Sequence, residues 1–509
     1  MSQVVVVGSG MGGLAAAARL SALGHRVVVV EAASTYGGKL ARLEKDGFVF
    51  DTGPSLLTLP AVYRDLFAKT ALRRRGAALE DNVDLVAVDP AFHYRFPDGT
   101  ELWVPNASRS GTARALDEAL GAGAGGQWTA LIDHAAAVWQ VTRTPFLERP
   151  LTGPLDLVRK SIRVRDLRTV APLTSLRRIG RRYLTDPRLR MMLDRYATYA
   201  GSDPRRAPAA LVVVPYIEQT FGAWHIGGGL AELARATYER CVERDIEFRF
   251  DSKVTQVLVE GSKAAGVVLA DGQRLNADVV VANVDATGLY RDLVPPQYSG
   301  SAPGRLRSAT ASSSAFTMML AVRGRPAGLA HHNVLFPADY DAEFDAMFGP
   351  SPSVVTDPAV YVCAPDDPRM RPDVDHQALF VMVNAARHVP ATDHDSAAGG
   401  PGVDWRAPGL SQAYAESILA VLAARGLDLR ERLLWSQVRT PADLEAATGS
   451  VGGSIYGTSS NGPRAAFLRP ANRSPLAGLF LVGGSAHPGG GLPLVGLSAE
   501  IVAALVGPA

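Results

Sequence analysis

Six residues near the amino end of the chain, GSGMGG at positions 8–13, have the spacing GxGxxG. They directly follow Val4–Val7, and four consecutive β-branched residues are typical of a parallel strand that is buried on both faces. The alanine-rich stretch 14–23 that comes next predicts a helix, which ends at Gly24. Strand, glycine-rich turn and helix in this order place main-chain N–H groups and the positive end of the helix dipole where they can bind phosphates.

The three spaced glycines have separate tasks, and a carboxylate completes the pattern. Gly8 permits the tight turn, Gly10 lets the main chain approach the phosphates, and Gly13 lets helix and strand pack closely. A second apolar strand is predicted at Val27–Val30, and Glu31 stands at its carboxyl end, about twenty residues beyond the glycines. Glu31 can accept hydrogen bonds from both ribose hydroxyls, and its charge disfavours the 2′-phosphate of NADP. We therefore predict a dinucleotide-binding βαβ unit.

Further turns favour FAD over NAD as the dinucleotide. Gly37-Gly38-Lys39 follows Glu31 closely, and the turn 51–55, which contains Gly53 and Pro54, ends the predicted strand 47–50. These turns add N–H groups and a cation along an elongated ligand, and a flavin dinucleotide needs such contacts.

The carboxyl end of the chain predicts a second contribution to the same cofactor. Leu479–Val482 reads as a short buried strand, 487–491 as a glycine-rich loop and Leu497–Val506 as an apolar helix. The N-terminus of such a helix can point at the flavin O2, where negative charge grows on reduction. His487 in this loop has two interpretations, a catalytic residue or a buried histidine whose hydrogen bonds go to the backbone.

These motifs resemble those of the phytoene desaturase family of bacterial carotenoid enzymes, within the flavoprotein class that includes amine oxidases. The likeness runs nearly end to end, and it also covers Tyr199–Pro204, Gly227–Gly229, Asp278–Asn283 and Gly483–Ser498. It implies FAD as the cofactor, with the main chain at Val254 beside the adenine. With the glycines and Glu31, the implied cofactor-binding residues are Gly38, Lys39, Gly53, Pro54, Val254, Gly484, Leu494 and Val495.

The sequence departs from the family pattern at five positions. His225 and Ile226 stand where an aromatic residue and a proline commonly precede the glycines, and Ser485, Ala486 and Leu494 replace the usual Gly, Thr and Gly. These changes leave the predicted FAD site in place but weaken any inference about which carotenoid is oxidised.

The resemblance implies desaturation of a carotenoid such as phytoene. A flavin takes one hydrogen as hydride at N5, the other leaves as a proton, and oxygen or a quinone reoxidises the flavin. Asp156 and Arg159 stand at i and i+3, roughly where the family has an Asp-x-x-Arg pair with proposed acid/base roles. The alternative is an ordinary surface ion pair, which contributes little.

The same fold could also serve other functions. Three alternative enzymes are a carotene isomerase, a ketolase and an amine oxidase. Another is a non-catalytic protein that binds prenyl lipids without redox chemistry, although the intact Gly8, Gly10, Gly13 and Glu31 argue against it.

The order of predicted elements indicates an α/β protein. We expect a Rossmann-type, amine-oxidase-like FAD-binding domain that carries an inserted mixed-sheet and helical part for the substrate and the membrane. The predicted boundaries are 1–82, 224–300 and 468–509 for the discontinuous FAD-binding domain, 83–223 for a helical, membrane-associated insertion, and 301–467 for a mixed α/β substrate-binding domain.

Composition narrows the possible partners. The formal net charge of +2 argues against a surface devoted to nucleic acid. Cys241 and Cys363 are far apart and lack the spacing of a metal site or a disulfide framework, so no metal is expected. With neither a secretory signal nor a long apolar run in the sequence, we expect a cytoplasmic protein, and its oligomeric state stays open.

Residues 155–184 predict contact with a membrane surface. This stretch contains nine lysines and arginines against Asp156 and Asp166, and Leu176, Ile179 and Tyr183 fall at helical spacing. Such a basic amphipathic surface suits an anionic bilayer, whereas the alternative is a solvated helix face. A hydrophobic polyene is available only in lipid, so we predict peripheral association with the inner face of the cell membrane.

Overall fold

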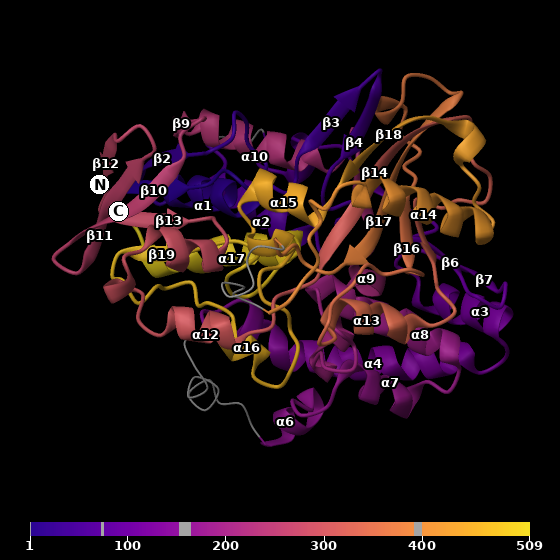
Figure 1. Ribbon diagram of the computed structural model, residues 1–509. Coiled ribbons are helices and arrows are strands. Elements are labelled where there is room, and N and C mark those ends of the chain that lie inside the picture. Colours follow the sequence, from indigo (N-terminus) through magenta and orange to yellow (C-terminus); the bar gives the residue numbers. More distant parts are fainter. Residues whose placement is uncertain (1, 73–75, 152–163, 391–399) are drawn as a thin grey trace.

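The computed structural model describes residues 2–72, 76–151, 164–390 and 400–509. A five-stranded parallel sheet forms the first of its two large layers (Figure 1), in the order β19-β13-β1-β2-β9. The strands are β1 (Gln3–Val7), β2 (Arg26–Val30), β9 (Glu247–Arg249), β13 (Val279–Ala282) and β19 (Leu479–Leu481). Segments from the beginning, middle and end of the chain therefore share one sheet.

The valines of β1 and β2 alternate between two apolar layers. Val4 and Val6 pack against α1 (Met11–Ala22), α10 (Ala231–Glu243) and α17 (Leu492–Val506). Val5 and Val7 face the antiparallel meander β10 (Val254–Glu260), β11 (Lys263–Leu269) and β12 (Arg274–Asn276). A strand covered on both faces must be apolar throughout, which explains the unbroken valine runs.

Helix α2 (Ala61–Thr70) lies against α1 and α17, and two small sheets join the layers. These are the hairpin β3 (Arg42–Lys45) and β4 (Phe48–Asp51), and the pair β5 (Leu85–Ala87) and β8 (Trp224–Ile226). The hairpin leads from the dinucleotide-type sheet to the second large layer.

The second layer is a mixed seven-stranded sheet in the order β18-β14-β17-β16-β15-β6-β7. Its strands are β6 (Phe92–Arg95), β7 (Glu101–Val104), β14 (Ser314–Arg323), β15 (His332–Leu335), β16 (Val360–Cys363), β17 (His376–Ala385) and β18 (Leu433–Arg439). β6 pairs in parallel with β15, so the two inserted segments share this sheet. The predicted domain boundaries themselves stay a prediction.

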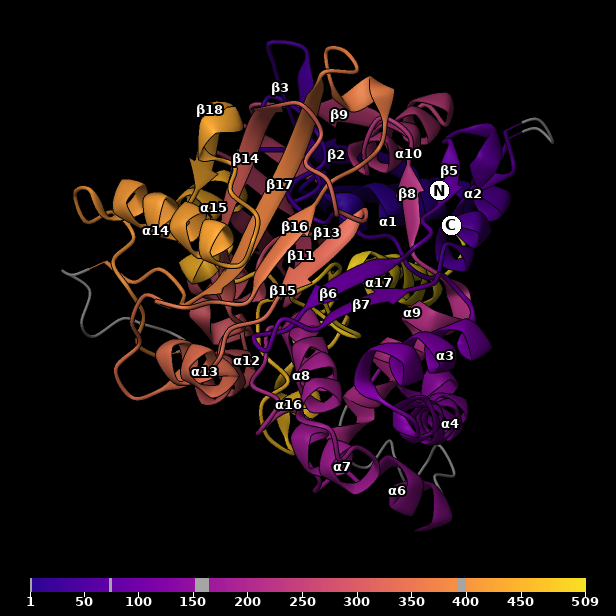
Figure 2. The same cartoon turned by 90° about the vertical axis from the view of Figure 1, so that its right-hand side faces the viewer.

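Helices cover the seven-stranded sheet (Figure 2). Helix α14 (Leu410–Ala424) packs on Phe316, Met318 and Leu320, whereas Met319 and Ala321 face the β3–β4 hairpin. A separate helical layer adjoins β6 and β15. It consists of α3 (Arg109–Leu120), α4 (Ala124–Thr142), α6 (Val164–Val170), α7 (Leu176–Tyr183), α8 (Pro187–Arg195), α9 (Val213–Phe221) and α13 (Tyr340–Phe348). The described residues also form α11 (Ala286–Gly288), α12 (Ala302–Ser308), α15 (Pro441–Thr448) and α16 (Ala465–Leu468).

The predicted α/β class and the elements around the predicted site are confirmed. The strands predicted at Val4–Val7 and Val27–Val30 are β1 and β2, and the helix predicted at 14–23 is α1, which begins three residues earlier. Helix α17 begins at Leu492, five residues before the predicted start. Pro493 lies in its first turn, where a main-chain N–H has no partner within the helix, so the proline costs no hydrogen bond there.

Candidate functional site

A glycine-rich turn joins β1 to α1 at the carboxyl end of the parallel sheet. Gly8 has φ +95°, which favours glycine, and a Cβ on Gly13 would lie 2.0 Å from the Gly8 carbonyl oxygen. Gly10 is the N-cap of α1, and no side chain of the described residues caps this helix end. The first N–H groups of α1 are therefore available for an anion.

Glu31 lies directly against this turn. One carboxylate oxygen accepts hydrogen bonds from the Ser9 main-chain N–H (2.7 Å) and the Ser9 hydroxyl (2.9 Å). The other oxygen accepts from the Ala33 N–H at 2.9 Å. The Ser252 N–H donates to the Glu31 carbonyl at 2.7 Å, so the segment that begins β10 at Val254 lies next to the same strand end. The predicted ribose and adenine contacts are thus neighbours.

The Glu31→Ala variant is expected to bind flavin at least about tenfold more weakly, since charge-assisted hydrogen bonds contribute about 1.5–3 kcal/mol each. The measurement is flavin content after gel filtration, together with titration of the flavin-free protein. Glu247→Ala on the neighbouring strand β9 is the matched control and should keep full occupancy. Full occupancy of Glu31→Ala would contradict the ribose role.

Asn283 is a central residue of the turn, a role that sequence reasoning missed. Its N–H donates to the Val7 carbonyl at 2.8 Å, and its side-chain amide donates to the Val482 carbonyl at 3.0 Å. A Cβ on Gly10, Gly12 or Gly483 would come within 2.8 Å of this side chain. The available signal was its position just after β13, because ligands bind beyond the carboxyl ends of parallel strands.

The remaining predicted cofactor residues lie close to this turn. A Cβ on Gly38 would lie 3.2 Å from the Gly10 Cα, and one on Gly53 would lie 1.8 Å from the Lys39 carbonyl oxygen. Pro54 follows in the same turn. The structure therefore brings both glycine turns of the sequence analysis to the end of α1.

The C-terminal loop approaches from the other side. A Cβ on Gly12 would lie 2.9 Å from the Gly483 Cα. A Cβ on Gly484 would lie 3.9 Å from Cγ2 of Val495. Leu494 contacts Gly489 of the same loop. No described side chain caps the N-terminus of α17, which begins here, so a second helix end is available near the first.

His487 matches the backbone-satisfied interpretation. Its ring is buried, and Nε2 is hydrogen-bonded to the Arg149 carbonyl at 3.0 Å. The Asn472 side-chain amide donates a hydrogen bond to the His487 carbonyl at 2.8 Å.

Three charged side chains lie beside the C-terminal loop, Asp285 buried and Lys39 and Arg469 partly buried. Lys39 Nζ donates to the carbonyls of Ser454 (2.9 Å) and Ile455 (2.7 Å). Arg469 donates to three carbonyls, those of Tyr456, Thr458 and Gly484. Asp285 interacts electrostatically with both cations.

Burial dominates the electrostatics of this group. It lowers the pKa of Lys39 to about 8 and the pKa of Arg469 to about 10, and the charge of Asp285 opposes both shifts. Burial also raises the pKa of Asp285, against the charge of Lys39. Two cations and one carboxylate leave net positive charge beside the C-terminal loop, which would stabilise the negative charge of a reduced flavin bound there.

The lowered pKa of Lys39 predicts a pH dependence of stability. Below pH 8 both folded and unfolded states hold the proton, and the folded state carries the full cost of the buried charge. Between about pH 8 and 10.5 only the unfolded state holds it, so the unfolding free energy rises with pH, on the order of 3 kcal/mol. Urea unfolding across this range tests the effect: Lys39→Met should remove the rise, whereas Lys69→Met at an exposed site should keep it. An equal rise in Lys39→Met would contradict the assignment.

The predicted pair Asp156 and Arg159 lies outside the described residues, so its acid/base role stays a prediction. The other predicted residues, Gly8, Gly10, Gly13, Glu31, Gly38, Lys39, Gly53, Pro54, Val254, Gly484, Leu494 and Val495, are distributed around the carboxyl end of one parallel sheet. Two helix N-termini, a carboxylate at a strand end and glycines that admit no Cβ suit a dinucleotide.

Comparison with known proteins agrees with this geometry. The family model described as flavin containing amine oxidoreductase matches residues 11–397. The chain belongs to this family. It is a flavin-dependent oxidoreductase, as the sequence analysis predicted.

Similar proteins match over nearly the full length. A 4,4'-diapolycopene oxygenase from Methylomonas is 32% identical over 98% of this chain and 97% of its own. A 1-hydroxycarotenoid 3,4-desaturase from Flavobacterium is 30% identical over 99% of both chains. The structure of cyclohexylamine oxidase from Brevibacterium oxydans has TM-score 0.62 at 14% identity, with 99% of this chain and 98% of that one covered, and this likeness shows the fold.

Proposed function

We propose that this flavoenzyme desaturates a carotenoid such as phytoene with bound FAD, and that the electrons pass to oxygen or a membrane quinone. The observation that carries the proposal is the full-length similarity to carotenoid enzymes. It extends through the seven-stranded sheet as well as the dinucleotide-binding part, so it includes the region expected to hold the substrate.

The residues of the chain have defined tasks in this proposal. Glu31 holds the ribose, the N-terminus of α1 binds the diphosphate, and the N-terminus of α17 lies towards the flavin ring. Lys39 and Arg469 supply positive charge. When bound, the flavin supplies a hydride acceptor. The protein positions the polyene and keeps water out.

The test is incubation of the flavin-loaded protein with phytoene in liposomes, with a quinone or oxygen as acceptor. We expect products that lack two hydrogens per step, seen by mass spectrometry and by absorption at longer wavelength. Flavin-free protein is the control. Unchanged phytoene despite full flavin occupancy contradicts the proposal, and release of aldehyde and ammonia from amines would favour an amine oxidase.

A second candidate is oxygenation of a carotenoid, which the similarity to the 4,4'-diapolycopene oxygenase favours. The same incubation under isotopically labelled oxygen separates the two reactions. Incorporated label indicates oxygenation, whereas loss of hydrogen alone indicates desaturation. Bound but unconverted carotenoid would favour a lipid-binding protein.

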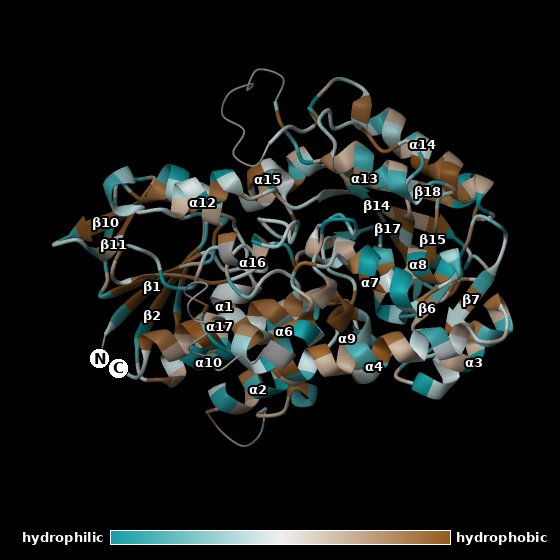
Figure 3. Ribbon diagram, turned by 90° about the horizontal axis from the view of Figure 1, so that it is seen from below, coloured by the Kyte–Doolittle hydropathy of each residue, from teal (hydrophilic) through white to brown (hydrophobic). Residues whose placement is uncertain are grey.

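We also propose peripheral association with the inner face of the cell membrane, through the described part of the basic stretch. Arg178, Arg181 and Arg182 are exposed on α7, which is strongly hydrophilic in Figure 3, and Leu173 just before it is 84% exposed. Leu176 and Ile179 are buried in the protein, so the apolar spacing noted in the sequence serves the core. The arginines therefore provide most of the attraction. Among the described helices, none has the length and apolarity needed to cross a bilayer.

Replacing Arg178, Arg181 and Arg182 together by glutamine is expected to weaken binding to anionic vesicles about 100-fold, at about 1 kcal/mol for each cation. Vesicle flotation measures the effect, and high salt should release the wild type. Replacement of the exposed Arg274, Arg307 and Arg430 is the matched control. Binding that resists salt would point to apolar insertion instead.

A further inference from the structure

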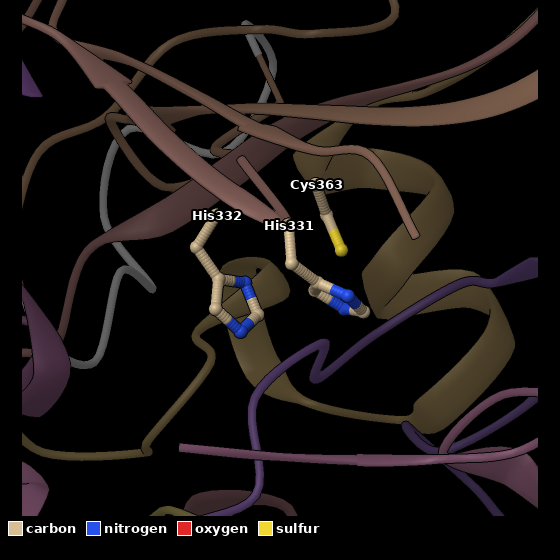
Figure 4. A group of neighbouring side chains, drawn as sticks. All are labelled: His331, His332 and Cys363. Atoms are coloured by element: carbon tan, nitrogen blue, oxygen red, sulfur yellow. The ribbon is translucent and has the colours of Figure 1, made fainter. Parts of the chain in front are cut away.

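Two histidines and a cysteine come together beneath the seven-stranded sheet. His332 begins β15 and is directly opposite Cys363 at the end of the antiparallel strand β16. His331 precedes β15 by one residue. Figure 4 shows the three side chains pointing to the same side of the sheet. One ligand atom from each can be chosen so that all three atoms lie within 4.8 Å of one another.

One nitrogen of each histidine lacks the partner that a buried polar atom needs. Nε2 of His331 and Nε2 of His332 are both buried and have no hydrogen-bond partner among the described residues. His332 is fully buried. Two such atoms are costly to the fold unless something binds them.

The second nitrogen of His332, Nδ1, already has a hydrogen-bond partner. Nδ1 shares a hydrogen bond of 2.7 Å with the Tyr361 hydroxyl, which in turn bonds Ser55 Oγ at 2.8 Å. Metal-binding histidines are commonly fixed in this way through the nitrogen that does not bind the metal.

A small cavity adjoins the cluster. Its walls include His331, Cys363, His225, Asp51 and Ser55, and its volume is about 10 Å³. This is room for a single ion or water. Two imidazoles and a thiolate with an open fourth position form a donor set that suits Zn²⁺.

We propose that His331, His332 and Cys363 bind a zinc ion, with the fourth coordination position open to this cavity. Ligand atoms around tetrahedral zinc lie about 3.3–3.8 Å apart, so the side chains must close by roughly 1 Å. The three ligands come from the seven-stranded sheet and the residue that precedes β15, and the cavity borders the turn 51–55 through Asp51 and Ser55. Binding replaces the Cys363 proton by the metal.

The test uses the flavin-loaded protein, treated with chelator, resupplied with Zn²⁺ and dialysed. We expect one zinc per chain by elemental analysis, with an X-ray absorption shell that contains one sulfur at about 2.3 Å and nitrogens at about 2.0–2.1 Å. Zinc should also raise the melting temperature. Cys363→Ser and His332→Gln should lower zinc affinity at least about tenfold.

Matched controls come from the same chain. Cys241→Ser changes the other buried cysteine, and His376→Gln changes a histidine at the start of β17; both should retain zinc. Flavin content reports whether each variant folds. The proposal is overturned if the wild-type protein retains no zinc above background, or if its zinc has no sulfur ligand. The cavity then holds water only.

Discussion

The Gly13→Val variant is expected to bind no flavin and to lose more than about 3 kcal/mol of unfolding free energy. A Cβ at this position would lie 2.0 Å from the Gly8 carbonyl oxygen, which is backbone and cannot turn aside. Overpacking alone costs about 1–3 kcal/mol, and here it also separates α1 from the turn whose N–H groups face the phosphates. Flavin absorbance and urea unfolding measure both effects.

Gly126→Ala provides the control for Gly13. Gly126 lies on α4, and a Cβ there meets nothing within 4 Å. It should keep its flavin and gain up to about 1 kcal/mol, since alanine favours a helix more than glycine does. Normal flavin binding by Gly13→Val would show that close helix–strand packing is not required.

The Arg469→Met variant is expected to cost about 3–5 kcal/mol in unfolding free energy and to weaken flavin binding. The guanidinium donates to the carbonyls of Tyr456, Thr458 and Gly484, and it offsets the buried carboxylate of Asp285. Without it these acceptors lose their donor, and the loop at Gly484 is no longer tied to the segment 456–458. Calorimetry and flavin titration are the measurements.

Two further variants sharpen this test. Arg469→Lys should recover only part of the loss, because an ammonium cannot reproduce the planar fork of a guanidinium. Arg464→Met, five residues earlier and exposed, should have little effect. A stable, fully flavin-loaded Arg469→Met protein would contradict the role in holding the loop.

Local patterns predicted the parts of the site that lie close together in sequence. Gly8, Gly10, Gly13 and Glu31 belong to a single strand–turn–helix–strand unit, whose geometry follows from short-range rules. The helix before the last residues was also predictable, apart from its first turn, where Pro493 conceals the start.

Long-range pairing set the limits of the sequence analysis. Asn283 reaches the glycines because β13 lies beside β1, and Arg469 reaches Gly484 through a folded loop. Cys363 has no histidine near it in the sequence, because His332 lies opposite it on the adjacent strand β15 and His331 precedes that strand. Helical spacing likewise could not tell whether Leu176 faces lipid or the protein core.

The contact between α1 and α17 affects the order in which the molecule can be made. The helix formed from the first residues packs against the one formed from the last, and the Ala509 N–H donates to the Leu23 carbonyl at 3.1 Å. The chain leaves the ribosome from its amino end, so the apolar flank of α1 that faces α17 stays uncovered until residues 492–506 have been synthesised. The second helix N-terminus of the candidate site belongs to α17, so this part of the site is likewise missing from the nascent chain until then.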